Sequence, residues 1–101
     1  MAKIIWTNES LRWLQAIDKH IAKSSHEAAA KVVEGIYYKV QILVTNPRAG
    51  FRYSTLTERE VRVLLYGHYR VFYEVSEDAL VTILGVFHAA LDISQYLDPP
   101  L

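Results

Sequence analysis

Cysteine is absent from the sequence, which excludes disulfides, thiolate metal sites and cysteine nucleophiles. Glycine and proline are scarce, with 4 and 3 residues, and 51% of the residues are apolar, so collagen-like, low-complexity and disordered chains are also excluded. A chain of 101 residues fits one domain, residues 1–101, and can bury enough surface to fold without a metal or a disulfide. We therefore expect a single globular domain with a hydrophobic core.

Charge of one sign is not in excess, because eleven Lys and Arg residues balance eleven Asp and Glu residues. No overall field favours nucleic acid or an anionic membrane, so any anion-binding site has to be local. Long apolar runs are missing too: no stretch approaches the ~18 residues of a membrane span, and Met1–Trp6 is too short for a signal sequence. We expect a protein that neither spans a membrane nor is exported, with the cytoplasm as its location.

The first half of the sequence predicts a strand and then a helix. Lys3–Thr7 is short, β-branched and aromatic, as strands are, and Thr7–Asn8 suits the cap of a helix that starts near Glu9. Apolar residues then recur every three or four positions up to Lys23, at Leu11, Leu14, Ile17 and Ile21.

A second helix follows directly. Ser24 and Glu27 have the spacing of a capping box, and the apolar period continues to Asn46–Pro47, where proline disfavours helical geometry in the preceding residue. Two such helices, over residues 9–46, form an antiparallel hairpin in which Gly35 permits a close crossing.

The second half of the sequence predicts strands. Pro47–Gly50 has turn chemistry, and residues 51–58 have no clear period and form a loop with at most a short extended piece. Three β-rich runs follow, at residues 61–66, 69–75 and 80–87, and their short connections require an antiparallel meander. The fold class is therefore α+β: an N-terminal strand, a helical hairpin and a three-stranded antiparallel meander, with the helices packed on one sheet face.

Alternation along the strands assigns residues to faces once the length of the Gly67–His68 turn is fixed. A two-residue turn places Arg70 with Val61, Val63 and Leu65, whereas an odd-length loop places it with Arg62. We prefer the odd loop because it separates polar from apolar residues better. It puts Val61, Val63, Leu65, Tyr69, Val71, Tyr73 and Val75 beneath the helices, and leaves Arg62, Tyr66, Arg70 and Glu74 on an open face.

Several motifs occur in a recognisable order. They are Pro47–Gly50 after the second helix, the aromatic-flanked arginine of Gly67–Tyr73, the acidic turn after it, and His88, eighteen residues after Arg70. In this order they resemble the RelE/ParE superfamily of bacterial toxins over nearly the whole chain. The resemblance implies a growth-inhibiting toxin of a type II toxin–antitoxin system, with a cognate antitoxin that wraps and neutralises it. It also implies one of two targets, the ribosome with its messenger RNA or DNA gyrase.

The resemblance to the RNA-cleaving branch implies a set of catalytic residues in this chain. Attack of a 2′-hydroxyl on a phosphate needs a base, an acid and positive charge on the phosphate. Arg62 and Arg70 would hold the phosphate and His88 would exchange the proton, while Tyr66 or Tyr96 would stack on a base.

Three features favour the gyrase branch. His88 to Asp92 carries no arginine where many relatives of the RNA-cleaving branch have one or two, and the net charge is zero. The long helical hairpin, with Ala28 to Ala30 at the start of its second helix, resembles gyrase poisons. Our first interpretation is therefore a ParE-like gyrase poison, the alternative is a ribosome-dependent messenger-RNA endonuclease, and a third is a degenerate relative that only binds its antitoxin.

Simpler interpretations of the same residues remain open. Arg70 can pair with Glu74 on its own strand, and His88 can be a strand-end residue with no task. The four histidines lack the spacing of a ligand set, so we expect no metal, and we expect no cofactor. An open sheet face needs a cover, which an antitoxin in a hetero-oligomer or a second copy in a homodimer would supply.

Overall fold

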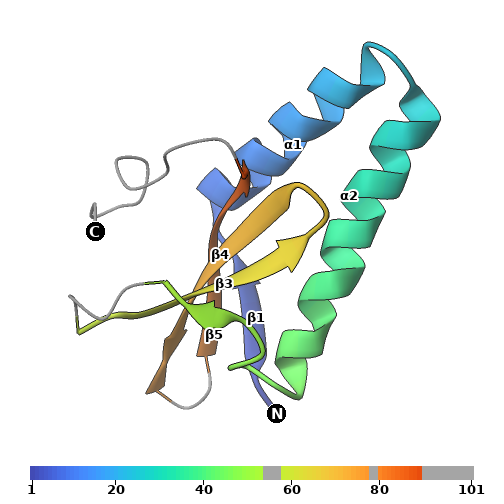
Figure 1. Ribbon diagram of the computed structural model, residues 1–101. Coiled ribbons are helices and arrows are strands. Elements are labelled where there is room, and N and C mark those ends of the chain that lie inside the picture. The colour runs from blue at the N-terminus through green and yellow to red at the C-terminus, as the bar shows by residue number, and fades with distance from the viewer. Residues whose placement is uncertain (54–57, 78–79, 90–101) are drawn as a thin grey trace.

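The computed structural model describes residues 1–53, 58–77 and 80–89 (Figure 1). The elements in chain order are β1 (Lys3–Trp6), α1 (Asn8–Ala22), α2 (His26–Val40), the 3₁₀ helix η1 (Gln41–Val44), β2 (Phe51–Arg52), β3 (Glu60–Tyr66), β4 (Tyr69–Ser76) and β5 (Leu80–His88). The predicted α+β class is confirmed, with two α-helices packed on a sheet.

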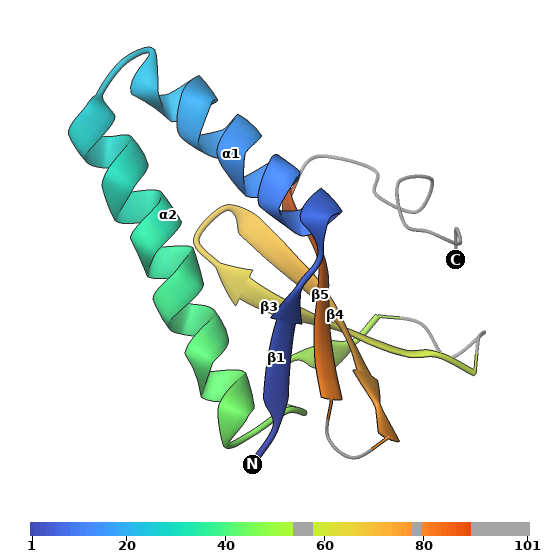
Figure 2. The same cartoon turned by 180° about the vertical axis from the view of Figure 1, so that it is seen from behind.

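The sheet has five strands in the order β1-β5-β4-β3-β2. The predicted antiparallel meander is β3-β4-β5, and β2 adds a short antiparallel edge to it. β1 pairs in parallel with β5, so the sheet is mixed (Figure 2). Parallel neighbours need a long connection, and the elements between β1 and β5 supply it.

Both helices begin at hydroxyl caps. The Thr7 side chain accepts a hydrogen bond from the Ser10 amide, and the Ser25 side chain accepts one from the Ala28 amide. The predicted capping box at Ser24 and Glu27 is therefore wrong by one residue, because Ser25 has the extended backbone that a cap requires. The second helix also ends at Val40, earlier than predicted, and continues as η1.

The main core lies between the helices and one face of the sheet. Leu14, Ile36, Val40 and Leu43 pack there on a row of strand residues, Leu64, Val71, Tyr73, Val75, Val81, Ile83 and Val86. The turn between α1 and α2 lies beyond the sheet, so the far end of the hairpin projects away from the strands (Figures 1 and 2). Among the described residues, no helix is long and apolar enough to cross a membrane.

The predicted face assignment of β3 is wrong. Gly67 has a φ of 56°, which allows a two-residue turn, and Tyr66 lies directly opposite Tyr69. Arg70 consequently lies opposite Leu65, on the face away from the helices, and Arg62 lies opposite Tyr73 on the helix face. The odd loop failed as a prediction because it assumed that one face is polar, whereas the second face has its own apolar cluster.

That second cluster consists of Val61, Val63, Phe72 and Phe87, each no more than 1% exposed, with Trp13, Tyr53 and Leu84 packed against it. A β-bulge brings Phe87 into it. Phe72 pairs with Gly85 and the adjacent Tyr73 pairs with Ile83, so Leu84 is an extra residue that reverses the faces after it. Val86 therefore points to the helices, Phe87 joins the second cluster, and the face predicted to be open is covered at its centre.

Candidate functional site

The three predicted catalytic residues are not brought together. Arg62 and His88 lie on the helix face, whereas Arg70 lies on the opposite face. Arg62 is opposite Tyr73 and His88 is opposite Tyr69, so the two are also separated by four positions along β4, roughly 13 Å. No single surface collects these residues.

Arg62 has a structural role in the sheet. Its Nε donates to a Glu60 carboxylate oxygen at 2.7 Å, and one terminal nitrogen donates to the Gly50 carbonyl at 2.8 Å. Glu60 and Arg62 alternate onto the same face because they are two residues apart on one strand. That spacing was the sequence signal for this ion pair.

Glu60 joins two arginines. Arg48, from the turn after η1, donates to both carboxylate oxygens at 2.8 and 2.9 Å. The hydrogen bonds from Arg48 and then Arg62 lower the pKa of Glu60 from 4.5 to about 2, against the opposing effect of burial. The same pair raises the pKa of Arg48. Because a carboxyl group with so low a pKa accepts protons poorly at neutral pH, Glu60 is unsuited to general-base chemistry.

The Gly50 peptide is held from both sides. Its carbonyl accepts from Arg62, and its amide donates to the fully buried Tyr73 hydroxyl at 2.9 Å. Burial raises the pKa of this tyrosine. A side chain at Gly50 would collide with the Val63 carbonyl and the Tyr73 hydroxyl, so glycine is required by the close approach of the turn to β3.

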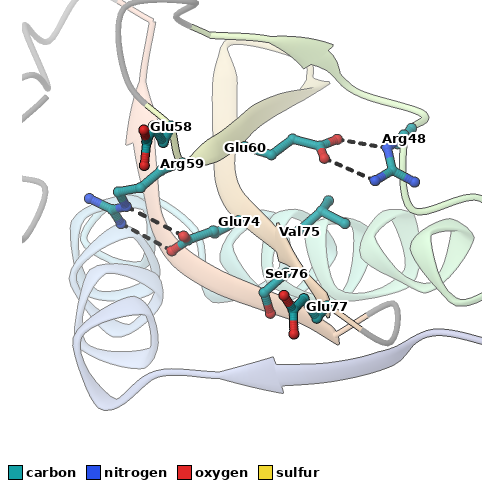
Figure 3. A pocket seen from close by; sticks show the side chains of 8 residues that line it. All are labelled: Arg48, Glu58, Arg59, Glu60, Glu74, Val75, Ser76 and Glu77. Atoms are coloured by element: carbon teal, nitrogen blue, oxygen red, sulfur yellow. Dashed lines mark hydrogen bonds and ion pairs between the residues drawn. The ribbon is translucent and has the colours of Figure 1, made fainter.

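An open pocket of about 480 Å³ lies beside this network (Figure 3). Its lining residues are Arg48, Glu58, Arg59, Glu60, Glu74, Val75, Ser76 and Glu77. On one side Arg48 reaches Glu60, and on the other Arg59 donates to Glu74 at 3.1 Å. Glu74 is therefore paired with Arg59 rather than with Arg70. The two arginines that line the pocket pair with two of its four glutamates, Glu60 and Glu74.

His88 lies at a second pocket, of about 280 Å³, between α1 and the ends of β4 and β5. Its ring stacks on His68 with centroids 6.1 Å apart and meets Tyr69 edge-on at 5.7 Å. His20 also lines this pocket, beside Trp13 and Ile17. The described residues contain no group of three or more histidines, aspartates or glutamates that could hold a metal ion.

Of the two tyrosines predicted to stack on a base, Tyr66 lies within the described residues. Tyr66 faces the helices and packs on Gly35, where an added side chain would overlap its ring and hydroxyl. The close approach predicted at Gly35 is therefore to a strand tyrosine and not between the helices. Tyr96 lies outside the described residues.

Comparison with known proteins gives a consistent result. The family model for the ParE toxin of the type II toxin–antitoxin system, parDE, matches residues 4–93. A protein of Sinorhizobium fredii (strain NBRC 101917 / NGR234) described as "Putative toxin Y4kP" is 38% identical over 87 residues, which cover 86% of this chain and 88% of that protein.

One solved structure agrees with this match. The chromosomal ParDE toxin–antitoxin system from P. aeruginosa superposes with a TM-score of 0.72 and 28% identity, covering 87% of this chain and 96% of that one. The toxin–antitoxin complex RelBE2 from Mycobacterium tuberculosis superposes with a TM-score of 0.48 and 20% identity, covering 86% of this chain and 96% of that one. This similarity is too low to bear on function. By its family match, this chain belongs to the ParE toxins of type II toxin–antitoxin systems.

Proposed function

We propose that this protein arrests growth by inhibiting DNA gyrase, and that a cognate antitoxin holds it inactive until the antitoxin is lost. The ParE family match over residues 4–93 and the similarity to a ParDE system support a toxin with an antitoxin partner. The choice of gyrase over messenger RNA rests on the geometry of the predicted catalytic residues.

The observation that carries this choice is the distribution of Arg62, Arg70 and His88 over two faces of the sheet. RNA cleavage needs an acid, a base and positive charge within hydrogen-bond reach of one phosphate. Arg62 already donates to Glu60 and Gly50, and Arg70 is on the other face from His88. Gyrase poisoning needs no such cluster, since the toxin then acts by binding and the enzyme it binds performs the chemistry.

Two assays with the purified toxin test the proposal. In the first, gyrase supercoils relaxed plasmid with ATP, and we expect the toxin to block this reaction and the antitoxin to restore it. In the second, cell-free translation is followed with the length of the message, and we expect intact messages. Cut messages together with normal supercoiling would identify an endonuclease, and no effect in either assay would identify a relative that only binds its antitoxin.

His88→Ala separates the two activities further. A nuclease that uses this imidazole as acid or base should lose about 10²-fold or more of its rate. A gyrase poison has no proton to transfer, so its inhibitory concentration should stay within a factor of about three, which corresponds to less than about 1 kcal/mol. Loss of gyrase inhibition on this substitution, in a protein that unfolds at an unchanged temperature, would contradict the proposal.

A further inference from the structure

We propose that Arg70, with Leu65 and Phe51, forms the surface that receives an acidic side chain of the antitoxin together with an apolar neighbour on the same antitoxin segment. The inference rests on the proposed function, in which an antitoxin binds this toxin. These three residues are called the Arg70 surface below.

The Arg70 surface lies on the face away from the helices. Arg70 is opposite Leu65 on β3 and opposite Phe87 on β5, so the three residues form one row across the sheet. Phe51 is opposite Val63 in the adjacent row. Leu65 is 51% exposed and Phe51 is 52% exposed, although Phe87 and Val63 in the same rows are buried. A cation thus lies between an exposed apolar edge and a buried apolar centre.

The charge of Arg70 has no partner among the described residues. Three other arginines near the sheet are in ion pairs: Arg48 and Arg62 with Glu60, and Arg59 with Glu74. Glu74, four residues along the same strand, is therefore already engaged. A partly buried guanidinium has lost part of its hydration, and an incoming carboxylate can take two of its N–H groups in a bidentate hydrogen bond.

A shallow hollow of about 280 Å³ lies at β3, and one of its lining residues is Leu65, which is opposite Arg70. Phe51 and Leu65 line it, and Lys39 contributes a second positive charge. The volume suits one aliphatic or aromatic side chain. The surface therefore matches a segment in which an acidic residue stands next to an apolar one.

A protein fits this surface better than a nucleic acid does. Nucleic acid presents phosphates in series and is bound by several cations together. On this face Arg70 stands between Leu65 and Phe87, while Arg62 is on the other face and paired. Arg70 among apolar side chains, with Lys39 at the hollow beside Leu65, is the pattern of a protein interface, in which a buried charge pair adds specificity.

Titration calorimetry of the antitoxin with variants of the whole toxin tests the inference. The antitoxin is taken to be the product of the adjoining open reading frame. We expect Arg70→Gln to weaken binding by about 30-fold or more. Leu65→Ser should weaken it by about fivefold or more, because the apolar contact is lost. Arg12→Gln is the matched control, since it removes the same group from an exposed position on α1 and should change affinity by less than about twofold.

Substitution of each antitoxin aspartate and glutamate by its amide then identifies the partner. One of these substitutions should weaken binding to the wild-type toxin but add little to the loss of affinity caused by Arg70→Gln. The combined loss should then be at least about tenfold smaller than the product of the two single losses. Circular dichroism and thermal unfolding of each toxin variant serve as the folding control.

The outcomes are distinct. Wild-type affinity for Arg70→Gln, equal losses for Arg70→Gln and Arg12→Gln, or additivity with every antitoxin carboxylate would each overturn the Arg70 surface while leaving the proposed function intact. If Arg70→Gln lowers binding to a DNA or RNA duplex but not to the antitoxin, the surface is for nucleic acid and the inference is wrong. No binding of the antitoxin to the wild-type toxin would overturn the antitoxin partnership itself.

Discussion

At the scale of single residues, the carboxylate of Glu60 controls how the turn after η1 is fixed to the sheet. Its pKa is about 2 in the folded protein, against an ordinary 4.5. Because the folded pKa is the lower one, the stabilisation is complete above pH 4.5 and is lost as the pH falls toward 2. We expect the unfolding free energy to decline over this range, by about 1–2 kcal/mol once solvent screening of the exposed Arg48 is included.

Glu60→Gln should remove that part of the pH dependence and lower stability at pH 7 by a similar amount, as urea unfolding at several pH values would measure. The control is Glu27→Gln, since Glu27 faces Lys31 at 3.9 Å with both side chains largely exposed. Its effect on stability should stay below about 0.5 kcal/mol. An unchanged acid profile for Glu60→Gln would show that the network contributes nothing to folding.

At the scale of elements, the start of α2 depends on one hydroxyl. Ser25 accepts from the Ala28 amide at 3.1 Å, whereas Ser24 precedes the cap. Ser25→Ala should destabilise the protein by about 0.5–2 kcal/mol, and Ser24→Ala should have little effect. Thermal unfolding of the two variants checks this, and the reverse order would restore the capping box that the sequence suggested.

The packing of α2 on β3 is tested at Gly35. Alanine is the better helix former by about 1 kcal/mol, yet a methyl group here would overlap the Tyr66 ring. We expect the collision to prevail, so that Gly35→Ala lowers the unfolding free energy by about 1–3 kcal/mol. The double variant with Tyr66→Leu should regain part of this loss, and simple additivity of the two substitutions would rule out the contact.

At the scale of the whole molecule, the two faces of the sheet give their arginines different tasks. Arg62→Ala breaks hydrogen bonds to Glu60 and Gly50 and should cost about 1–3 kcal/mol of stability. Arg70→Ala should stay within about 0.5 kcal/mol, since none of the described residues is paired with it. Denaturant unfolding of both variants measures the difference, and equal losses would contradict the separation of roles.

The sequence was sufficient for the order of the two α-helices and the four longer strands, because each of these has a strong local signal. Thr7 marks the start of α1, and the few residues between β3 and β4 and between β4 and β5 require antiparallel strands. The faces could not be obtained in the same way. The extra residue at Leu84 cannot be detected from the alternation of polar and apolar residues along β5. The burial of Phe72 on the second face depends on residues that are distant in the chain.

The candidate site was less predictable than the fold for the same reason. Which carboxylate an arginine can reach depends on the side of the sheet that it occupies. The error of register put Arg62 on the same face as Arg70, whereas Arg62 lies on the helix face. The pairing of Glu60 with Arg48 also spans twelve residues, and no local pattern reports it.

The parallel pairing of β1 with β5 has a consequence for synthesis. Lys3 to Trp6 leave the ribosome long before their partners, Leu80 to Ile83, so this edge of the sheet closes late. Trp13 of α1 also lacks its ring contact until then, because it packs on Phe87 of the same late strand. A message cut before the codons for residues 80–88 would thus give a polypeptide without β5, in which β1 has no neighbouring strand and the second cluster has no Phe87.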